Sequence, residues 1–352
     1  MLNKIITPLL NWYRQNKREL PWRDQNNAYY TWVSEIMLQQ TRVEAVKPYF
    51  QRFTEELPDV RALAECPEEK LLKLWEGLGY YNRVRNMQKA ACQVVELYNG
   101  VLPASYEELL SLKGIGSYTA GAIASIAYGL PIPAVDGNVL RVITRIQEDA
   151  GDIMKQSVKK QIETELKDVM PEDVPGDFNQ ALMELGAVIC VPNGQPKCEE
   201  CPVSFCCQAF HHGTIEKYPV KAQKKLRKIE KRTVLVIQDG NYTALKKRLD
   251  QGLLAGLYEL PNTEGHLSQK EALEKVKALG LEPLYIEPLP KAKHIFSHIE
   301  WRMTGYRIRV AALEKKHTQG LIFADRKESH RQYAIPSAFS AYIKFMKEET
   351  VK

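Results

Sequence analysis

Five of the seven cysteines lie within residues 190–207, where residue type and spacing point most directly to chemistry. Seven residues separate Cys190 from Cys198, two more separate it from Cys201, and four more precede the adjacent pair Cys206 and Cys207. Four thiolates from one short loop can close around a metal centre, because two-residue spacing lets one turn present two sulfurs to one site. The spacing alone does not separate zinc from an iron–sulfur cluster, and it leaves one cysteine spare.

A disulfide framework is the weaker interpretation of these cysteines. The opening segment MLNKIITPLLNWYRQNK turns polar too soon for a signal peptide, so we expect a reducing, cytoplasmic compartment. The segment VPNGQPKCEECPVSFCC is a proline-rich loop and not an apolar helix face, which argues against buried structural thiols. The sequence therefore predicts a metal or cluster site.

Two acidic residues have surroundings that suit acid–base chemistry. Glu35 is a lone acid among apolar and amide residues, and burial there would keep it protonated as a general acid. The ordinary alternative is a first-turn glutamate that the helix dipole favours. Asp136 precedes the apolar run that starts at Val139, where it could simply cap a helix or face a developing cation as a carboxylate. A protonated Glu with an ionised Asp is the pair that cleaves glycosidic bonds, so we hypothesise that they lie together.

A glycine-containing turn lies between two helical patterns in the segment LKGIGSYTA. Gly114 and Gly116 permit a tight turn with positive φ and close approach of another backbone. The free N–H groups of the helix that follows would favour a phosphate. Although such a turn is a weak signal alone, the segment near residues 106–128 is predicted to be a helix-hairpin-helix that binds DNA backbone.

The length, the apolar runs and the charge of the chain indicate its domain organisation. Its 352 residues allow two or three domains, and no apolar run reaches the roughly 18 residues that span a bilayer. Residues 216–232 hold eight Lys or Arg and two Glu, which accounts for the net charge of +6 of the full chain. Such a run is typical of a solvated linker, and it would also suit DNA phosphates.

Apolar periodicity predicts helices before the basic segment, at residues 5–13, 33–53, 71–75, 84–98, 106–112, 119–128, 139–146, 158–169 and 179–189. After it, strands are predicted at residues 233–238, 242–245 and 302–310, and helices at 267–280 and 337–348. We therefore predict a mainly α domain at 1–215 with a cysteine loop at 190–207, a basic linker at 216–232, and an α+β domain at 233–352.

Seven segments together resemble a known family. In order they are LPWR, SEIMLQQTRV, GLGYYNR, GIGSYTAGAI, VDGNVLRV, FNQALMELGAVIC and the cysteine loop. They closely resemble adenine DNA glycosylases of the MutY type over nearly the whole chain. The resemblance implies an endonuclease III-like helix-hairpin-helix domain with a [4Fe–4S] cluster, followed by a MutT/NUDIX-like domain that checks the opposite strand for 8-oxoguanine.

The resemblance also implies roles for individual residues. Glu35 would protonate N7 of a flipped adenine, Asp136 would stabilise the oxocarbenium ion through a transient covalent adduct, and Asn138 and Tyr118 would support the sugar side. Bifunctional relatives carry a lysine nucleophile where this chain has Tyr118, so a monofunctional enzyme is expected. The residues that match the adenine pocket are Trp22, Arg23, Leu38, Val43, Gln180 and Arg18.

Further matches concern the DNA and the cluster. Gln40 and Tyr80 match residues that enter the base stack when the base is flipped out. In the C-terminal domain Ser297 would hydrogen-bond the oxidised guanine, with Phe296 and His298 shaping that contact, although exposed strand residues are the ordinary alternative. The acidic box of active MutT hydrolases is missing from residues 267–280, so recognition is expected there. The family cysteine spacing of six, two and five selects the ligands Cys190, Cys198, Cys201 and Cys207, with one residue inserted in the first gap and Cys206 left as a free thiol or alternative ligand.

The expected function is a monofunctional base excision repair glycosylase that removes adenine mispaired with 8-oxoguanine or guanine in double-stranded DNA. One site per chain favours a monomer, located in the cytoplasm with the nucleoid and without a membrane. Whether a sliding clamp or a mismatch-repair protein binds it stays open. The alternatives are an endonuclease III-like glycosylase for oxidised pyrimidines, a non-catalytic iron–sulfur DNA-binding or redox-sensing protein, and a zinc-stabilised DNA-binding module.

Overall fold

The structure is a computed structural model that describes residues 2–23, 25–222, 226–311 and 320–346. The chain divides into two compact units, Met1–Cys66 with Asn82–Gln223, and Pro67–Tyr81 with Lys224–Lys352. No helix within the described residues is long and apolar enough to cross a bilayer.

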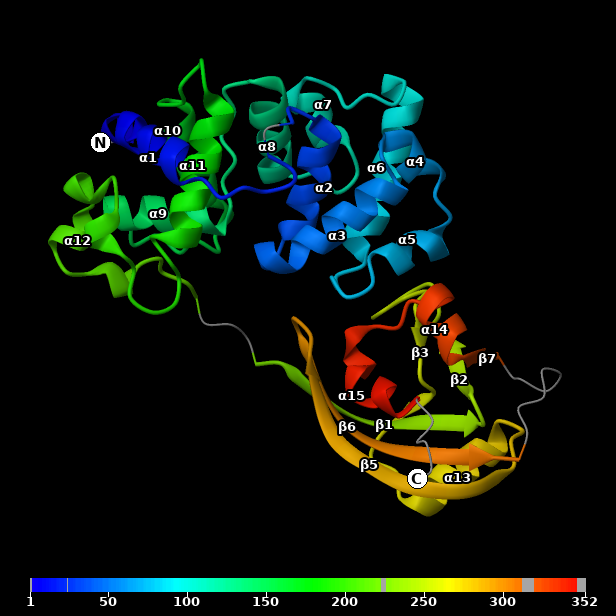
Figure 1. Ribbon diagram of the computed structural model, residues 1–352. Helices are drawn as coiled ribbons and strands as arrows, with labels where there is room; N and C mark the ends of the chain where they lie inside the picture. Colours follow the sequence, from blue (N-terminus) through cyan, green and yellow to red (C-terminus); the bar gives the residue numbers. More distant parts are fainter. Residues whose placement is uncertain (1, 24, 223–225, 312–319, 347–352) are drawn as a thin grey trace. The chain divides into compact units, whose positions relative to one another are not determined.

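The first unit is helical (Figure 1). Its α-helices are α1 (Ile6–Asn16), α2 (Ala28–Leu38), α3 (Val43–Glu56), α4 (Val60–Glu65), α6 (Asn82–Tyr98), α7 (Tyr106–Ser111), α8 (Ser117–Tyr128), α9 (Gly137–Gln147), α10 (Gln156–Lys167), α11 (Pro175–Val188) and α12 (Gln208–His211). Short 3-10 turns are η1 (Leu2–Ile5), η2 (Cys198–Glu200), η3 (Ser204–Cys206) and η4 (Ile215–Lys217).

These helices form two packed groups. In one group α11 packs against α1 and α9, and α9 also contacts α10 and α12. In the other, α2 packs against α3 and α8, with α7 against α8 and α4 against α6. Helix α9 shows why the elements form where they do, since Val139, Val142, Ile143 and Ile146 are buried at helical spacing in one core. Helix α11 also contacts α8 and so joins the two groups.

The single helix predicted over residues 33–53 is wrong, because the chain breaks after Leu38 and resumes as α3 at Val43. In the break Gln40 takes a left-handed backbone with φ 61°. The Arg83 guanidinium donates to the carbonyls of Ile36 and Gln39, both at 2.7 Å, and so satisfies groups that the end of α2 leaves open. The apolar repeat continues through the break since both helices bury one face, and periodicity alone could not show it.

The glycine turn joins α7 to α8. Gly114 has φ 79°, and a Cβ there would lie 2.7 Å from Asn86 Cβ, so both the backbone angle and the neighbouring helix require glycine. Gly116 has φ −100° and caps α8, and nothing lies within 4 Å of where its Cβ would be. The expected left-handed conformation therefore holds for Gly114 alone, while Gly116 leaves the helix N-terminus uncovered.

The second unit is built on a mixed sheet. Its strands are β1 (Lys228–Asp239), β2 (Tyr242–Lys247), β3 (Tyr258–Glu259), β4 (Asn262–Glu264), β5 (Pro283–Ile295), β6 (Ile299–Val310) and β7 (Leu321–Asp325). The described strands run in the order β3-β2-β1-β6-β5, with β4 also on β1 and β7 on β2. β1 and β6 pair in parallel and the other pairs are antiparallel.

Helical segments cover both faces of this sheet (Figure 1). They are α13 (Gln269–Ala278) on one face, and η5 (Ser337–Phe339), α15 (Ser340–Ile343) and η6 (Lys344–Met346) on the other. Two further helices belong to this unit, since α14 (Arg326–Gln332) contacts β7 and α5 (Glu68–Leu74) contacts α14. Strand β1 alternates between two cores, with Val234 and Val236 facing Phe339 and Tyr342, and Leu235 and Ile237 facing α13. This alternation follows from the two-residue period of a strand.

Two boundaries expected from the sequence differ from the structure. β1 begins at Lys228, so residues 228–232 of the predicted linker belong to a strand, and residues 223–225 lie outside the described residues. The regular helix predicted at residues 337–348 is wrong, since the chain there forms one four-residue α-helix, α15, between the 3-10 turns η5 and η6, and residues 347–348 lie outside the described residues. The apolar residues of this segment, among them Phe339 and Tyr342, still pack against the sheet, but from short helical turns and not from one regular helix.

Candidate active site

A cavity of about 760 Å³ lies in the first unit where the two helix groups meet. Its walls come from the segment after α1, from α2 and the break that follows it, and from α8, α9 and α11. It brings together residues that are far apart in the sequence and that were selected by motif. They are Arg18, Trp22, Arg23, Glu35, Leu38, Gln40, Val43, Tyr118, Asp136, Asn138 and Gln180.

Glu35 is a buried carboxyl group in the middle of α2, with 6% of its surface exposed. Burial raises its pKa to about 7, and the nearby Asp136 adds to the rise, while a hydrogen bond from Tyr118 and the charge of Arg23 oppose it. The Tyr118 hydroxyl donates that bond to Glu35 Oε2 from the first turn of α8. Burial also holds the pKa of Tyr118 well above its usual range, so Tyr118 stays a donor. Glu35 can therefore carry a proton near neutral pH.

Asp136 is the N-cap of α9 and has the opposite environment. Its Oδ1 accepts from the backbone N–H groups of Asn138 and Val139, both at 2.8 Å, and its Oδ2 accepts from the Asn138 amide at 2.7 Å. Burial holds its pKa above the usual range, and these three donors and the charge of Arg141 reduce that rise. All four do so because they stabilise the ionised form, as donors at a helix N-terminus do.

The sequence did not point to Arg141 or Gly186, which hold Asn138 in place. Arg141, with 5% of its surface exposed, donates to Asn138 Oδ1 at 2.9 Å, to the Gly186 carbonyl at 2.7 Å and to the Cys190 carbonyl at 2.7 Å. A Cβ at Gly186 would lie 2.6 Å from Asn138 Cβ, so only glycine lets α11 approach α9 this closely. A continuous set of hydrogen bonds thus runs from Asp136 to the cysteine loop.

Glu184 is a second residue that the sequence reasoning missed. It lies on α11 with 1% of its surface exposed. Its Oε1 accepts from Arg18 Nε at 2.5 Å, its Oε2 accepts from Arg23 Nη2 at 2.6 Å, and Arg23 Nη1 donates to the Arg18 carbonyl at 2.7 Å. Burial raises the pKa of Glu184, but the two arginines outweigh it and hold that pKa below its usual range. One carboxylate therefore orients both arginines of the cavity wall.

A signal for Glu184 was present in the sequence. It is a lone acid in the apolar helical run ALMELGAV, which is the pattern that singled out Glu35. What the sequence lacked was the identity of its partners, because Arg18 lies 166 residues away.

The two residues expected to enter the base stack share an uncommon backbone. Gln40 lines the cavity, is exposed and has φ 61°, while Tyr80 belongs to the second unit, is 50% exposed and has φ 48°. Left-handed conformations in residues other than glycine cost free energy and gather at functional sites. Their exposure also argues against core packing as the role of Tyr80.

The predicted recognition segment of the second unit is the hairpin tip between β5 and β6. The Phe296 backbone N–H donates to the Ile299 carbonyl at 2.8 Å, which closes the turn. Ser297 and His298 are exposed, and the Ser297 hydroxyl lies 3.1 Å from His298 Nδ1. Phe296 instead is partly buried and packs against the core of the sheet. The tip thus offers two polar side chains to solvent and one aromatic anchor to the interior.

Four cysteines line one small apolar pocket beside α9 and α11, and they are the four that the family spacing selects. Cys206 is not among its lining residues, and its thiol donates to the Val203 carbonyl at 3.4 Å. Arg145, with 6% of its surface exposed, donates to Cys190 Sγ at 3.2 Å. The pocket residues Cys190, Cys198, Cys201 and Cys207 therefore form one set, and the fifth thiol is occupied elsewhere.

The burial of these thiols is compatible with a metal centre, which binds cysteine as thiolate. Burial raises the pKa of Cys201 to about 12 and that of Cys207 to about 11, and the neighbouring sulfurs add to both rises. Thiols in such surroundings give up their protons when a metal cation replaces them. Within the described residues, no three Cys, His, Asp or Glu side chains are arranged as a ligand set for a metal ion. The four cysteines around the pocket nevertheless supply the kind and the number of thiols that a cluster needs.

Two family models match the chain, one for each unit. Residues 33–172 match the HhH-GPD superfamily base excision DNA repair protein, and residues 233–345 match the NUDIX domain. The adenine DNA glycosylase of Buchnera aphidicola subsp. Baizongia pistaciae is 35% identical over 295 residues, which are 83% of this chain and 82% of that protein. The adenine DNA glycosylase of Mus musculus is 35% identical over 85% of this chain and 69% of its own length.

The chain belongs to the adenine DNA glycosylases.

Solved structures agree on the fold of the helical unit of this family member. A thermostable thymine-DNA glycosylase is 27% identical, with a TM-score of 0.54 over 60% of this chain and 97% of that protein. Endonuclease III in a non-covalent DNA complex is 24% identical, with a TM-score of 0.52, and shows the same fold. The predicted fold, a helix-hairpin-helix glycosylase domain followed by a MutT/NUDIX-like domain, is confirmed.

The buried Glu184 pair predicts a large effect on stability. Replacing Glu184 by Gln keeps the shape but leaves two arginines without their anion, so the free energy of unfolding should fall by about 3 kcal/mol. The ionised form binds both arginines, so the stabilisation should be lost as pH falls below the ordinary glutamate pKa towards the lowered folded-state pKa. Urea unfolding of both proteins at several pH values measures this.

The control is Glu44→Gln, which removes an exposed pair to Lys47 on α3. Exposed pairs contribute little, so this change should stay within about 0.5 kcal/mol. If the two substitutions lowered the free energy of unfolding equally, the ion pairs of Glu184 would contribute no more than an exposed pair does.

Proposed function

We propose that this protein hydrolyses the N-glycosidic bond of adenine in duplex DNA where adenine opposes 8-oxoguanine or guanine. The single observation that supports this most is one cavity, in a member of the adenine DNA glycosylases, lined by a protonatable Glu35 and a capped Asp136. The product is free adenine and an abasic site.

The two carboxyl groups divide the work. Glu35 gives its proton to N7 of adenine, so that the bond between C1′ and N9 breaks and N9 keeps the electron pair. The sugar becomes an oxocarbenium ion, which the Asp136 carboxylate stabilises, forming a transient bond to C1′. Water then displaces Asp136 at C1′ and returns a proton to Glu35. Asn138 holds the Asp136 carboxylate in place, and Tyr118 holds Glu35.

The adenine must leave the helix to reach Glu35, because N7 and the sugar lie within the stacked duplex. The cavity is large enough for one base and is walled by Trp22, Arg23, Leu38, Val43 and Gln180, with Arg18 beside Arg23. In this proposal Gln40 and Tyr80 enter the base stack where adenine leaves it and where 8-oxoguanine stays. The N-terminus of α8, which follows the turn at Gly114 and which Gly116 leaves open, binds a backbone phosphate in this proposal.

The residue in the lyase position supports hydrolysis without strand scission. Bifunctional relatives use a lysine there, whose amine forms a Schiff base with C1′. In this chain the position holds Tyr118, a phenol that is already engaged with Glu35. The enzyme is therefore proposed to be monofunctional.

We also propose that Cys190, Cys198, Cys201 and Cys207 hold a [4Fe–4S] cluster. When bound, the cluster would supply four iron–thiolate bonds that cross-link the loop. The loop residues themselves do the rest, since Arg145 donates to Cys190 Sγ and Arg141 donates to its carbonyl. In the second unit, Ser297 is proposed to hydrogen-bond 8-oxoguanine, with His298 beside it and Phe296 as support.

The decisive test measures single-turnover release of adenine from duplexes in which adenine opposes 8-oxoguanine, guanine or thymine. Release should be fastest opposite 8-oxoguanine, slower opposite guanine and absent opposite thymine. Release of oxidised pyrimidines with no release of adenine would favour an endonuclease III-like activity. DNA binding with no release from any duplex would favour a non-catalytic protein.

The charge state of Glu35 predicts the pH dependence. A general acid works only when protonated, so the single-turnover rate should fall as pH rises through about 7, where Glu35 loses its proton. Glu35→Gln should reduce the rate by more than about a thousandfold, because an amide can neither protonate N7 of adenine nor accept the proton of the attacking water. Binding of a duplex with a non-cleavable adenine analogue serves as the control and should change little. A retained rate with an unchanged pH profile would remove Glu35 from this role.

Adjacent cysteines allow a matched test of the cluster ligands. Cys207→Ser should abolish the visible absorbance near about 400 nm that iron–sulfur proteins show, whereas Cys206→Ser should keep it. The reason is that Cys207 lines the pocket with the other three thiols, whereas Cys206 is not among its lining residues and its thiol donates to the Val203 carbonyl. The reverse result would assign Cys206 as the fourth ligand. Zinc in the purified protein without absorbance would contradict the iron–sulfur proposal.

A further inference from the structure

The hairpin tip rests on a tryptophan that the sequence reasoning did not select. The ring of Phe296 meets the ring of Trp301 edge to face, with centroids 4.9 Å apart and an angle of 71°. His294 meets the Phe296 ring from β5 at 4.6 Å and 67°. Trp301 is fully buried on β6, with 0% of its surface exposed. The position of Phe296, and so of the tip, depends on where this buried ring is held.

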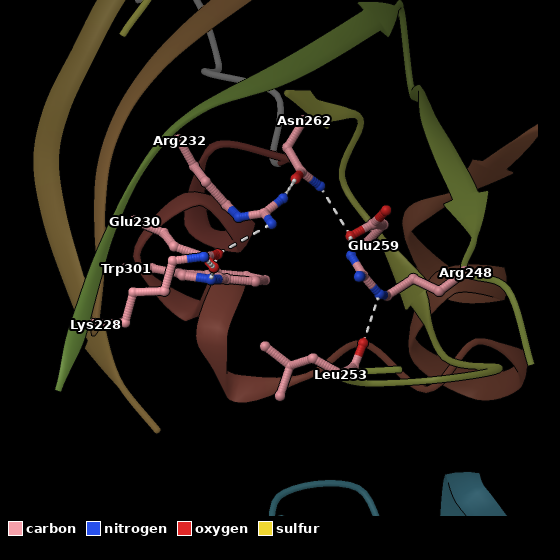
Figure 2. A network of polar contacts seen from close by, with 8 residues as sticks. All are labelled: Lys228, Glu230, Arg232, Arg248, Leu253, Glu259, Asn262 and Trp301. Carbon is pink, nitrogen blue, oxygen red and sulfur yellow. Dashed lines mark hydrogen bonds and ion pairs between the residues drawn. The ribbon is translucent and has the colours of Figure 1, made fainter. Parts of the chain in front are cut away.

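Polar contacts fix the Trp301 ring (Figure 2). Its Nε1–H donates to Glu230 Oε2 at 3.1 Å, and Arg232 Nη2 pairs with the same oxygen at 3.3 Å. The Arg232 guanidinium also lies over the ring, with its carbon 4.3 Å from the ring centroid. The edge and one face of the indole are thereby held by directional contacts as well as by packing.

The sheet register creates this arrangement. β1 and β6 are parallel, and Glu230 is directly opposite Trp301 across the pair. Arg232 lies two residues further along β1 and so shares the face of Glu230. A shift of one residue would turn both side chains to the other face.

The contacts continue beyond the indole, as Figure 2 shows. Arg232 Nη1 donates to Asn262 Oδ1 at 3.0 Å, and Asn262 Nδ2 donates to Glu259 Oε2 at 2.8 Å. Arg248 Nη1 pairs with that carboxylate oxygen at 2.5 Å, and Arg248 Nε donates to the Leu253 carbonyl at 2.9 Å. Both terminal nitrogens of the Arg232 guanidinium are thus engaged, Nη2 by Glu230 and Nη1 by Asn262.

Glu230 and Arg232 are partly exposed, so their ion pair by itself contributes little to stability. What directional contacts add is a single orientation of the ring. The tip above that ring carries Ser297 and His298, the exposed polar pair. A fixed ring orientation therefore has its clearest use in fixing where those two side chains stand.

We propose that Glu230, Arg232 and Trp301 are positioning residues for recognition of 8-oxoguanine. They hold Phe296 in place, and Phe296 in turn fixes the position in which Ser297 and His298 contact the oxidised base. This inference rests on the proposed function. It extends the recognition site from the exposed tip to the buried Trp301 on β6 and to the two β1 residues that hold it.

The test compares two conservative variants, Trp301→Phe and Arg232→Lys. The first keeps an aromatic ring but loses the indole N–H, and the second keeps the charge but loses the planar stack and the forked contacts. Single-turnover rates at saturating enzyme are measured with adenine opposite 8-oxoguanine and opposite guanine. We expect the ratio of the two rates to fall about tenfold in each variant, with the rate opposite guanine changed by less than about twofold.

Two comparisons separate positioning from general damage. Ser297→Ala combined with His298→Ala removes the tip itself, and adding Trp301→Phe to that pair should cause no further loss, since both act through one contact. Arg302→Met is the matched control, because Arg302 also lies on β6 but pairs with Glu300 as a largely exposed side chain. It should leave the ratio unchanged.

Three results would overturn the inference. An unchanged ratio in folded variants would show that the support does not matter, and an equal fall of both rates would show a structural role only. If Trp301→Phe fails to fold, Arg232→Lys decides between these outcomes. A wild-type protein with no preference for 8-oxoguanine would instead overturn the proposed recognition function, and this inference with it, so the two failures are distinguishable.

Discussion

The burial of one carboxyl group between α2 and α8 is the constraint on which the helical unit depends. The Tyr118 hydroxyl donates a hydrogen bond to Glu35, but the desolvation of the carboxyl group outweighs it and raises the pKa. A charged group in such a position is costly, so the group is held near the point where it gains and loses a proton. The α2–α8 contact that buries Glu35 also forms one wall of the cavity.

The second carboxyl group in the cavity is held in the opposite way. Asp136 is also buried, but it meets the N-terminus of α9 and three hydrogen-bond donors, which stabilise its ionised form and reduce the rise of its pKa. Placing two carboxyls in one cavity with different environments is how a fold assigns acid and base roles. The arrangement reaches back through Asn138 and Arg141 to the cysteine loop, so the loop and the site share one set of hydrogen bonds.

The two units use ion pairs for a similar purpose. In the helical unit, Glu184 orients Arg18 and Arg23 on the cavity wall. In the sheet unit, Glu230 and Arg232 orient a tryptophan under the hairpin tip. Neither arrangement is needed to bury apolar area, and each fixes the direction of side chains that face a ligand.

The sequence by itself determined the features that depend on local spacing. Helical periodicity located most helices, two-residue alternation located the strands, and the motifs selected Glu35, Asp136 and the pocket residues that the structure brings into one cavity. Periodicity failed to show the break between Leu38 and Val43, because the apolar repeat continues from α2 into α3 and contains no signal for the turn between them.

Only the tertiary structure decided which distant groups meet. The partners of Glu184 lie more than 160 residues away, and Glu230 meets Trp301 because two strands pair in parallel with one particular register. The close approach of α9 and α11 at Gly186 is likewise a property of packing. A carboxylate in an apolar run is visible in the sequence, but its charge state and its partner depend on burial and on chains that fold back from elsewhere, which no local pattern encodes.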